Sequence, residues 1–454
     1  MGLRFVLGRA GSGKSETVYR ELAERQKTAE GPRLLLVVPE QYSLQAERDM
    51  SRRLGRGFLH PWVLSFGRLA HRVFAECGTP RRLPLSDRSR AMVLRRILME
   101  NEDELTYYNR AADKPGFLDQ LSASLTECIR YGLEARQLEE MAHSLRPGSI
   151  LQRKLGDLAR IIRDYRAYLE QGYLSGDEQL DLLAAVAPQS RLLQNAIIYL
   201  DGFYGFTPQE YKVLGQMLRY GSQVTVSLTL DGATYGRPSL PETAPFFEPW
   251  DTARRLRELA GEVGVAVLPP VILGEPRRFL AEPLAALERE FFARSPKAYP
   301  SGGAVRVWGA ANRYTEGEQV AREILRLVRE EGYRFREVAV LTRDMADYAR
   351  SLPETLERCG IPCFVDSRRT VLAHPLTELV RAGVQAWAKG LAYEPLFRYL
   401  KTGLAGLSRE ECDRLENYVL ARGLDRWYFR RPFADEELEA LRQRALAPLE
   451  AAFG

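Results

Sequence analysis

The stretch Gly8-Arg9-Ala10-Gly11-Ser12-Gly13-Lys14-Ser15 decides the fold of the first part of this 454-residue chain. It matches without a gap the phosphate-binding loop, in which a glycine and four further residues are followed by Gly-Lys-Ser/Thr. An apolar run at residues 3–7 precedes the loop and predicts a buried strand. Val18, Leu22 and Ala23 follow at helical spacing, so we expect a helix to begin at Ser15. A strand, a glycine-rich turn and a helix in this order are the context that the motif requires.

The residue types of this loop suit a nucleotide. Glycines let the backbone turn tightly and direct N–H groups inward, and the start of the helix adds partial positive charge. Lys14 is expected to neutralise the β- and γ-phosphates, and the Ser15 hydroxyl to bind Mg²⁺. The alternative is a chance match in a glycine-rich turn. All eight residues of the loop are therefore predicted to bind ATP with Mg²⁺.

A second acidic residue is needed to hold the metal ion, and Asp201 is the candidate. It follows an apolar run at residues 196–200 that predicts another buried strand. The alternative is an aspartate that starts a turn before glycine. Motor enzymes place a catalytic glutamate directly after this aspartate, whereas this chain has Gly202, and the nearest downstream carboxylate is Glu210. We therefore assign no catalytic residue and expect weak or no ATP hydrolysis.

Arg343 is a further candidate for the nucleotide site. It lies just after an apolar run at residues 338–341, where an arginine can reach a γ-phosphate across a cleft between two domains. Pairing with Asp344 or Asp347 on the surface explains the residue equally well. Both interpretations stay open from spacing alone.

Charge along the chain is uneven. The net charge is only +5, but residues 51–100 contain eleven arginines and three acidic residues. Such a segment suits a nucleic-acid backbone. The alternative is a solvated surface in a chain that uses arginine generally, since it has only eight lysines.

Five scattered cysteines, without a CxxC pair, indicate reduced thiols in a cytoplasmic protein. Cys359 and Cys363 are more simply explained as free thiols than as a metal site. No apolar stretch approaches the roughly 20 residues that span a membrane, so no membrane association is expected.

The pattern of apolar runs predicts an α/β fold with large helical insertions. Strands are expected at 34–38, 196–200 and 224–228, and a nearly continuous series of helices between about 86 and 190. A second α/β unit is expected to contain strands 304–308, 337–341 and 362–365, with a helix at 315–331. Residues 231–250 look like a loop, and the chain after 375 looks helical to its end.

Several motifs together resemble the AddB family, the second subunits of AddAB helicase–nucleases that process double-strand DNA breaks. The resembling segments are GRAGSGKS (8–15), VPEQYSLQAERD (38–49), VLSFGRLAHRVF (63–74), LDGFYGFTPQEY (200–211), VAVLTRD (338–344), GIPCFVDSRRTVLAHPL (360–376) and FRYLKTGL (397–404). The resemblance covers the chain from end to end. Only the phosphate-binding loop is generic among these motifs.

The resemblance implies P-loop RecA-like domains in a superfamily-1 helicase-like layout. The implied domains are 1A (1–85 plus 190–300), the helical insertion 1B (86–189), part of 2A (301–374) and the start of a helical insertion 2B (375–454). It also implies a bacterial cytoplasmic protein that acts in homologous recombination, forms a heterodimer with an AddA-type subunit and acts at single-stranded and double-stranded DNA ends.

The resemblance further implies contacts with single-stranded DNA at Gln41, Ser65, Phe66 and Arg68. Phe66 and Trp62 are candidates for stacking on bases. Packing in the core is the alternative for both rings, and we favour it for Trp62.

Members of this family are much longer and continue to a nuclease domain with a 4Fe-4S cluster. The five cysteines here do not fall in that pattern, so we expect an N-terminal fragment and place the cluster and nuclease activity in the full-length parent only. Two other classes stay open. One is a P-loop kinase or other phosphotransferase, and the other is a structural scaffold with a relic P-loop.

Overall fold

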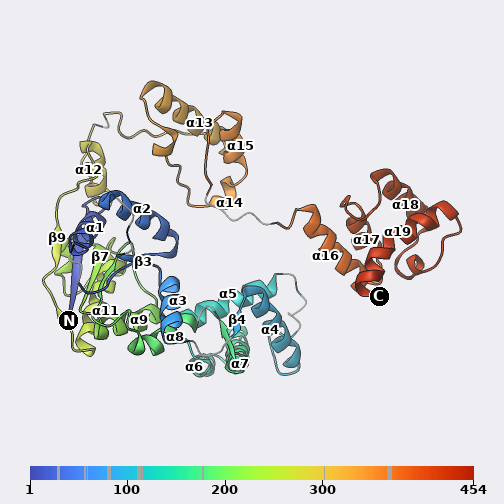
Figure 1. Cartoon of the computed structure of the whole chain (residues 1–454), viewed down its shortest axis with the longest axis horizontal. Helices are drawn as coiled ribbons and strands as arrows, with labels where there is room; N and C mark the ends of the chain where they lie inside the picture. The colour runs from blue at the N-terminus through green and yellow to red at the C-terminus, as the bar shows by residue number, and fades with distance from the viewer. Residues whose placement is uncertain are drawn as a thin grey trace. The chain divides into compact units, whose positions relative to one another are not determined.

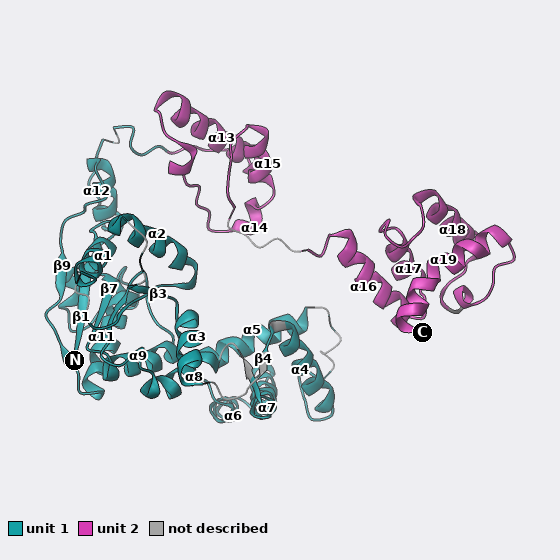
Figure 2. Ribbon diagram, viewed as in Figure 1, with its two compact units in different colours: residues 1–306 teal, residues 307–454 magenta. Residues whose placement is uncertain are grey.

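The computed structural model describes residues 1–27, 31–55, 58, 60–78, 83–109, 114, 116–175, 178–300, 302–365 and 371–454. The chain divides into two compact units, residues 1–306 and 307–454 (Figure 2). Each unit has hydrophobic clusters of its own.

A parallel sheet forms the centre of the first unit (Figure 1). Its strands are β1 (Gly2–Gly8), β2 (Leu34–Val37), β3 (Trp62–Leu64), β6 (Ile197–Leu200), β7 (Gln223–Thr229), β8 (Ala266–Val267) and β9 (Val271–Leu273). The strand order is β3-β2-β6-β7-β1-β8, and β9 also pairs with β1. Every one of these pairings is parallel, with Leu3 opposite Val224 and Leu36 opposite Tyr199. The continuous apolar runs follow from this arrangement, because parallel strands are buried on both faces.

Alternate residues of each strand pack against helices on opposite faces of the sheet. Leu34 and Leu36 of β2 join a cluster with α1 (Lys14–Arg25) and α2 (Ser43–Leu54). Leu35 and Val37 join the larger cluster on the other face. The helices of that cluster are α3 (Phe66–Cys77), α8 (Gln179–Val186), α9 (Pro208–Tyr220) and α11 (Phe247–Glu262).

A helical block is inserted between α3 and β6, as the sequence predicts. It contains α4 (Asp87–Glu100), α5 (Phe117–Arg130), α6 (Ala135–Ser144) and α7 (Ile150–Glu170), which gather beside the sheet in Figure 1. Two short strands, β4 (Leu83–Leu85) and β5 (Tyr173–Ser175), pair in parallel where the chain enters and leaves the block. Leu183 of α8, which follows these helices, packs in the hydrophobic cluster of the sheet.

The second unit contains two groups of helices. The first group is α13 (Arg313–Glu330), α14 (Met345–Tyr348) and α15 (Ser351–Arg358), and α13 confirms the helix expected at 315–331. The second is α16 (Pro375–Ala388), α17 (Tyr393–Leu400), α18 (Arg409–Arg422) and α19 (Glu436–Phe453), with its own core. The prediction that the chain is helical after residue 375 is confirmed.

Two local predictions are wrong. The stretches 304–308, 337–341 and 362–365 form no strands, and within the described residues of the second unit no strand lies beside them to accept their hydrogen bonds. Leu341 and Phe364 are therefore 94% and 90% exposed rather than buried. The stretch 231–250 is not all loop, since it contains α10 (Gly232–Tyr235), and α11 begins at Phe247.

Candidate nucleotide-binding site

The phosphate-binding loop connects the end of β1 to the start of α1, as its sequence predicts. Gly11 and Gly13 have φ values of +71° and +93°, in the left-handed region that favours glycine. A Cβ atom added at Gly8 would collide with Ser12 Oγ and lie 2.9 Å from Leu273 O. The pattern of glycines therefore follows from backbone conformation at two positions and from close packing at the third.

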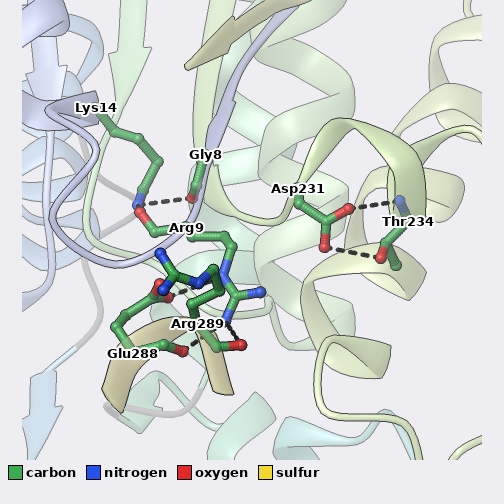
Figure 3. Close-up of polar contacts among 7 residues, drawn as sticks. All are labelled: Gly8, Arg9, Lys14, Asp231, Thr234, Glu288 and Arg289. Atoms are coloured by element: carbon green, nitrogen blue, oxygen red, sulfur yellow. Dashed lines mark hydrogen bonds and ion pairs between the residues drawn. The ribbon is translucent and has the colours of Figure 1, made fainter. Parts of the chain in front are cut away.

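Lys14 lies inside the loop rather than in solvent. Its Nζ donates hydrogen bonds to the carbonyl oxygens of Gly8 and Arg9, both at 2.9 Å (Figure 3). Burial lowers the pKa of Lys14, and the negative charge of Asp201 opposes this shift. The ammonium group is thus held by the carbonyl oxygens of the loop itself.

Asp201 lies at the carboxyl end of β6, separated from β1 by one strand. Its side chain is buried, and Oδ1 accepts a hydrogen bond from Ser227 Oγ of β7. Asp201 Oδ2 and Ser12 Oγ are buried without a hydrogen-bond partner among the described residues. Buried polar atoms usually have a partner, so the Ser12 hydroxyl is available to a phosphate and the second Asp201 oxygen to a metal ion.

A cavity of about 640 Å³ opens at this loop. Ser15 lines it, and so do four arginines, Arg52, Arg53, Arg277 and Arg278. Arg52 and Arg53 already pair with Asp49 and Glu16. Arg277 and Arg278 are exposed, and no carboxylate lies within ion-pair distance of them in the described part of the chain.

Sequence reasoning missed Arg277 and Arg278. They follow β9, a three-residue strand that pairs with β1 and so returns the chain to the phosphate-binding loop. Their backbone N–H groups donate to Gly11 O at 2.8 and 3.0 Å. The sequence signal was two consecutive arginines after a short apolar run. Such a run does not by itself indicate which strand it pairs with.

Two further carboxylates that follow strands of the sheet, Glu210 and Asp231, serve as helix caps. Glu210 Oε2 accepts from Thr207 N at 2.7 Å and from Thr207 Oγ1 at 3.1 Å, at the start of α9. Asp231, which follows β7, binds Thr234 N and Thr234 Oγ1 at 2.8 and 2.9 Å (Figure 3). Of these three carboxylates, Asp201 is the one with a buried oxygen that has no hydrogen-bond partner among the described residues.

The candidate DNA contacts lie in different environments. Gln41 is exposed in a short 3-10 helix (Glu40–Tyr42). Ser65 is buried, and its hydroxyl accepts from Arg68 N at 3.2 Å as the N-cap of α3. The Arg68 side chain is 48% exposed and pairs with Glu47 at 2.8 Å.

Phe66 lies in the core instead of on a surface that binds bases. Its ring centroid is 5.7 Å from that of Phe203 and 6.4 Å from that of Phe206, both in edge-to-face contact. With 7% of its surface exposed, the ring offers no face for stacking, and packing explains the residue. The stacking role expected for Phe66 does not agree with this placement.

A groove of about 460 Å³ lies beside β3, between α2 and α3. It is lined by Trp62 and by Arg48, Arg68 and Arg72. The Arg72 guanidinium lies 3.9 Å from the centre of the Trp62 ring, and His60 stacks at 5.8 Å. Two arginines of the arginine-rich segment, Arg68 and Arg72, therefore lie with Arg48 and Glu47 in one groove next to an aromatic side chain.

Arg343 lies in the second unit and is exposed. Its two expected surface partners are otherwise engaged, because Asp347 pairs with Arg313 at 2.7 Å and Asp344 accepts from Ala346 N at 2.9 Å. A contact between Arg343 and the nucleotide stays a prediction.

Comparison with known proteins shows the family of this chain. The family model described as "ADDB, N-terminal" matches residues 5–288, more than half of the chain. The chain belongs to the AddB family. A protein from Symbiobacterium thermophilum, named as a subunit of an ATP-dependent helicase/deoxyribonuclease, is 41% identical over 481 residues, covering 98% of this chain and 41% of its own length.

Further members of the AddB family show the same coverage. The proteins from Heliobacterium modesticaldum and Geobacillus kaustophilus carry the same name and are 40% and 37% identical, each over 99% of this chain. The chain spans about two fifths of the length of these relatives. No described helix is both long and apolar enough to cross a membrane.

Proposed function

We propose that this chain is the ATP-binding, single-stranded-DNA-contacting region of a helicase–nuclease subunit that repairs double-strand breaks by homologous recombination. The observation that carries the proposal is the phosphate-binding loop between β1 and α1, with Asp201 at the carboxyl end of β6 in the same parallel sheet. Membership of the AddB family supports it, because the relatives are named as subunits of an ATP-dependent helicase/deoxyribonuclease. The proposed partners are an AddA-type subunit and DNA ends.

In this proposal the first unit is a RecA-like nucleotide-binding domain. Lys14 Nζ and the N–H groups of the loop bind the β- and γ-phosphates, and Arg277 and Arg278 contact the phosphates from the facing wall. Ser15 and Asp201 hold Mg²⁺, which supplies charge neutralisation at the phosphates when it is bound.

Hydrolysis by this site is proposed to be weak or absent. In motor enzymes a carboxylate orients the attacking water and accepts its proton. Gly202 has no side chain for this task, and Glu210 is held by Thr207 as a helix cap. Asp201 is needed for the metal ion. The site is therefore suited to sensing nucleotide.

The DNA-contacting part of the proposal rests on the exposed positions, Gln41 and Arg68, and on the groove that contains Arg48 and Arg72. Guanidinium groups next to an aromatic ring suit a single strand, since phosphates pair with the arginines while bases stack. Phe66 is left out of this surface because its ring is buried.

Calorimetric titration of the whole chain with Mg-ATP, with and without a single-stranded oligonucleotide, tests the proposal. Phosphate release is assayed on the same samples. We expect binding with negligible release, and at least a hundredfold loss of affinity in Lys14→Ala, which removes the compact cation. Lys212→Ala is the matched control, because Lys212 is exposed and pairs with Asp181.

Each alternative class predicts a different result. No Mg-ATP binding indicates a relic loop and a scaffold. Phosphate transfer to a small acceptor indicates a kinase. Rapid release stimulated by DNA indicates a working motor and contradicts the role given to Gly202.

A further inference from the structure

The segment between β9 and the end of α12 (Glu282–Glu290) is bonded to the phosphate-binding loop at two points. At one end, the backbone N–H groups of Arg277 and Arg278 both donate to Gly11 O. At the other end, Arg9 Nε donates to Glu288 Oε1 at 2.9 Å, and Arg9 Nη2 donates to Glu288 O at 2.6 Å (Figure 3). Residues 277–288 are thus bonded to the loop at both of their ends.

Arg9 also completes the end of α12. Its Nη2 lies 3.3 Å from the carbonyl oxygen of Arg289, and the last carbonyls of a helix have no partner within the helix. The guanidinium is partly shielded, with 32% of the Arg9 side chain and 17% of the Glu288 side chain exposed. A charge-assisted contact of this kind is stronger than a solvent-exposed ion pair.

Apolar packing contributes little to the docking of α12. Its buried residues are Ala285 and Ala286, which have the smallest apolar side chains. Leu287 on the same helix is 47% exposed, and Leu280 just before it is 97% exposed. The contact of α12 with the loop through Arg9 is therefore polar.

The side chains of Arg277 and Arg278 line the same cavity as Lys14. A triphosphate in that cavity gains these two guanidinium groups only while the segment lies on the loop. A ligand that binds one of two states better shifts the equilibrium toward that state. Nucleotide binding and docking of the segment must therefore strengthen each other.

We infer that residues 277–290 form a clasp over the phosphates of a bound nucleotide, and that the Arg9–Glu288 pair latches it. Glu288 is a positioning residue, because it acts through Arg9 and lies outside the cavity lining. This inference rests on the proposed nucleotide binding. It adds a segment whose docking on the loop depends on whether nucleotide is bound.

Hydrogen–deuterium exchange of the whole chain, with and without Mg-ATP, tests the clasp in the wild type, Glu288→Ala and Glu282→Ala. Glu282 is the matched control, because it is an exposed carboxylate on the same helix that pairs with Arg289. In the wild type we expect Mg-ATP to slow exchange in 277–290 severalfold. In Glu288→Ala we expect faster exchange there without nucleotide, about fivefold weaker Mg-ATP binding, and full protection at saturating Mg-ATP.

Full protection from exchange at saturating Mg-ATP indicates that Glu288 positions the segment. If Glu288→Ala instead unfolds α12, we expect exchange there to stay fast at saturating Mg-ATP. Mg-ATP binding without any change of exchange in 277–290 overturns the clasp and leaves the proposed function standing. Equal affinity and exchange in the wild type and Glu288→Ala overturn the role given to the Glu288 carboxylate in the latch, since the contacts of Arg9 with the backbone of α12 remain in this variant. A wild type that does not bind Mg-ATP at all refutes both the proposed function and the clasp.

Discussion

Asp201 accepts a hydrogen bond from Ser227 Oγ on the neighbouring strand, while its second carboxylate oxygen is buried without a partner among the described residues. The hydrogen bond to one oxygen fixes the orientation of the carboxylate, and the other oxygen is left for a cation. Ser227 and Asp201 come from adjacent parallel strands, β7 and β6, whose carboxyl ends lie at the same edge of the sheet as the phosphate-binding loop.

Replacement of Asp201 by asparagine is expected to weaken ATP binding about tenfold or more in Mg²⁺ and to leave it unchanged in EDTA, because the amide cannot neutralise the metal ion. Asparagine still accepts the Ser227 hydrogen bond, so the fold should be kept. Calorimetry in both buffers measures the difference. Asp231→Asn is the control, since the contacts of that carboxylate among the described residues are with Thr234. Equal losses in Mg²⁺ and EDTA would argue for a structural role of Asp201.

Replacement of Phe66 by alanine is expected to lower the free energy of unfolding by about 3–5 kcal/mol, because it leaves a cavity beside Phe203 and Phe206. Phe66→Leu conserves most of the volume and should cost less than about 1.5 kcal/mol. Denaturant unfolding measures both. The leucine variant should bind single-stranded DNA like the wild type. If the leucine variant loses DNA affinity but keeps its stability, Phe66 contacts DNA after all.

Replacement of Arg68 by glutamine is expected to weaken binding of single-stranded DNA and to reduce the slope of log K against log salt by about 0.7 if one phosphate contact is lost. Arg96→Gln is the control, because Arg96 is exposed on the helical block and pairs with Glu100. Fluorescence anisotropy over a salt series gives both quantities. Parallel curves for the two variants would remove Arg68 from the DNA surface.

The parts of the fold that could be predicted are those in which local sequence and tertiary contacts agree. The runs at residues 3–7 and 34–38 are apolar at nearly every position, and β1 and β2 are buried on both faces. The loop at residues 8–15 combines glycines with a lysine whose spacing has a physical cause. These features could be predicted because each depends on residues that are neighbours in the sequence.

The parts that could not be predicted depend on partners far away in the sequence. β9 is three residues long, and only its pairing with β1 brings Arg277 and Arg278 to the cavity. Glu288 lies 279 residues from Arg9, so no spacing rule connects them. The run at 337–341 shows the opposite failure, since an apolar pattern does not make a strand without a neighbouring strand.

Phe66 shows why a resemblance to a motif does not place a side chain. It follows Ser65, which caps α3, and the first turn of that helix directs the ring toward Phe203 and Phe206. Both phenylalanines lie just after Asp201, so the segment that follows the metal-site strand also supplies the core contact of Phe66.

Acid is expected to destabilise the group of helices formed by α16 to α19 through Glu439. Its carboxylate binds the Arg442 guanidinium at 2.6 Å and accepts from Phe433 N at 2.7 Å, and the contact with Arg442 lowers the pKa of Glu439 to about 2. Arg442 is itself buried and donates to Phe429 O at 2.7 Å. A carboxyl group with a lowered pKa in the folded state stabilises the fold above its unfolded pKa of about 4.3. That contribution is lost as the pH falls from there toward 2.

Glu439→Gln should therefore lower the free energy of unfolding at pH 7 by about 1–2 kcal/mol, because Arg442 is left buried without a charge partner. The same variant should show a smaller further loss than the wild type between pH 4.5 and pH 2.5. Chemical unfolding followed by circular dichroism at a series of pH values measures both effects. Glu437→Gln is the control, since Glu437 pairs with Arg414 on the surface, where 67% of its side chain is exposed. If the two variants lose stability equally at every pH, the buried pair is not the source of the acid sensitivity.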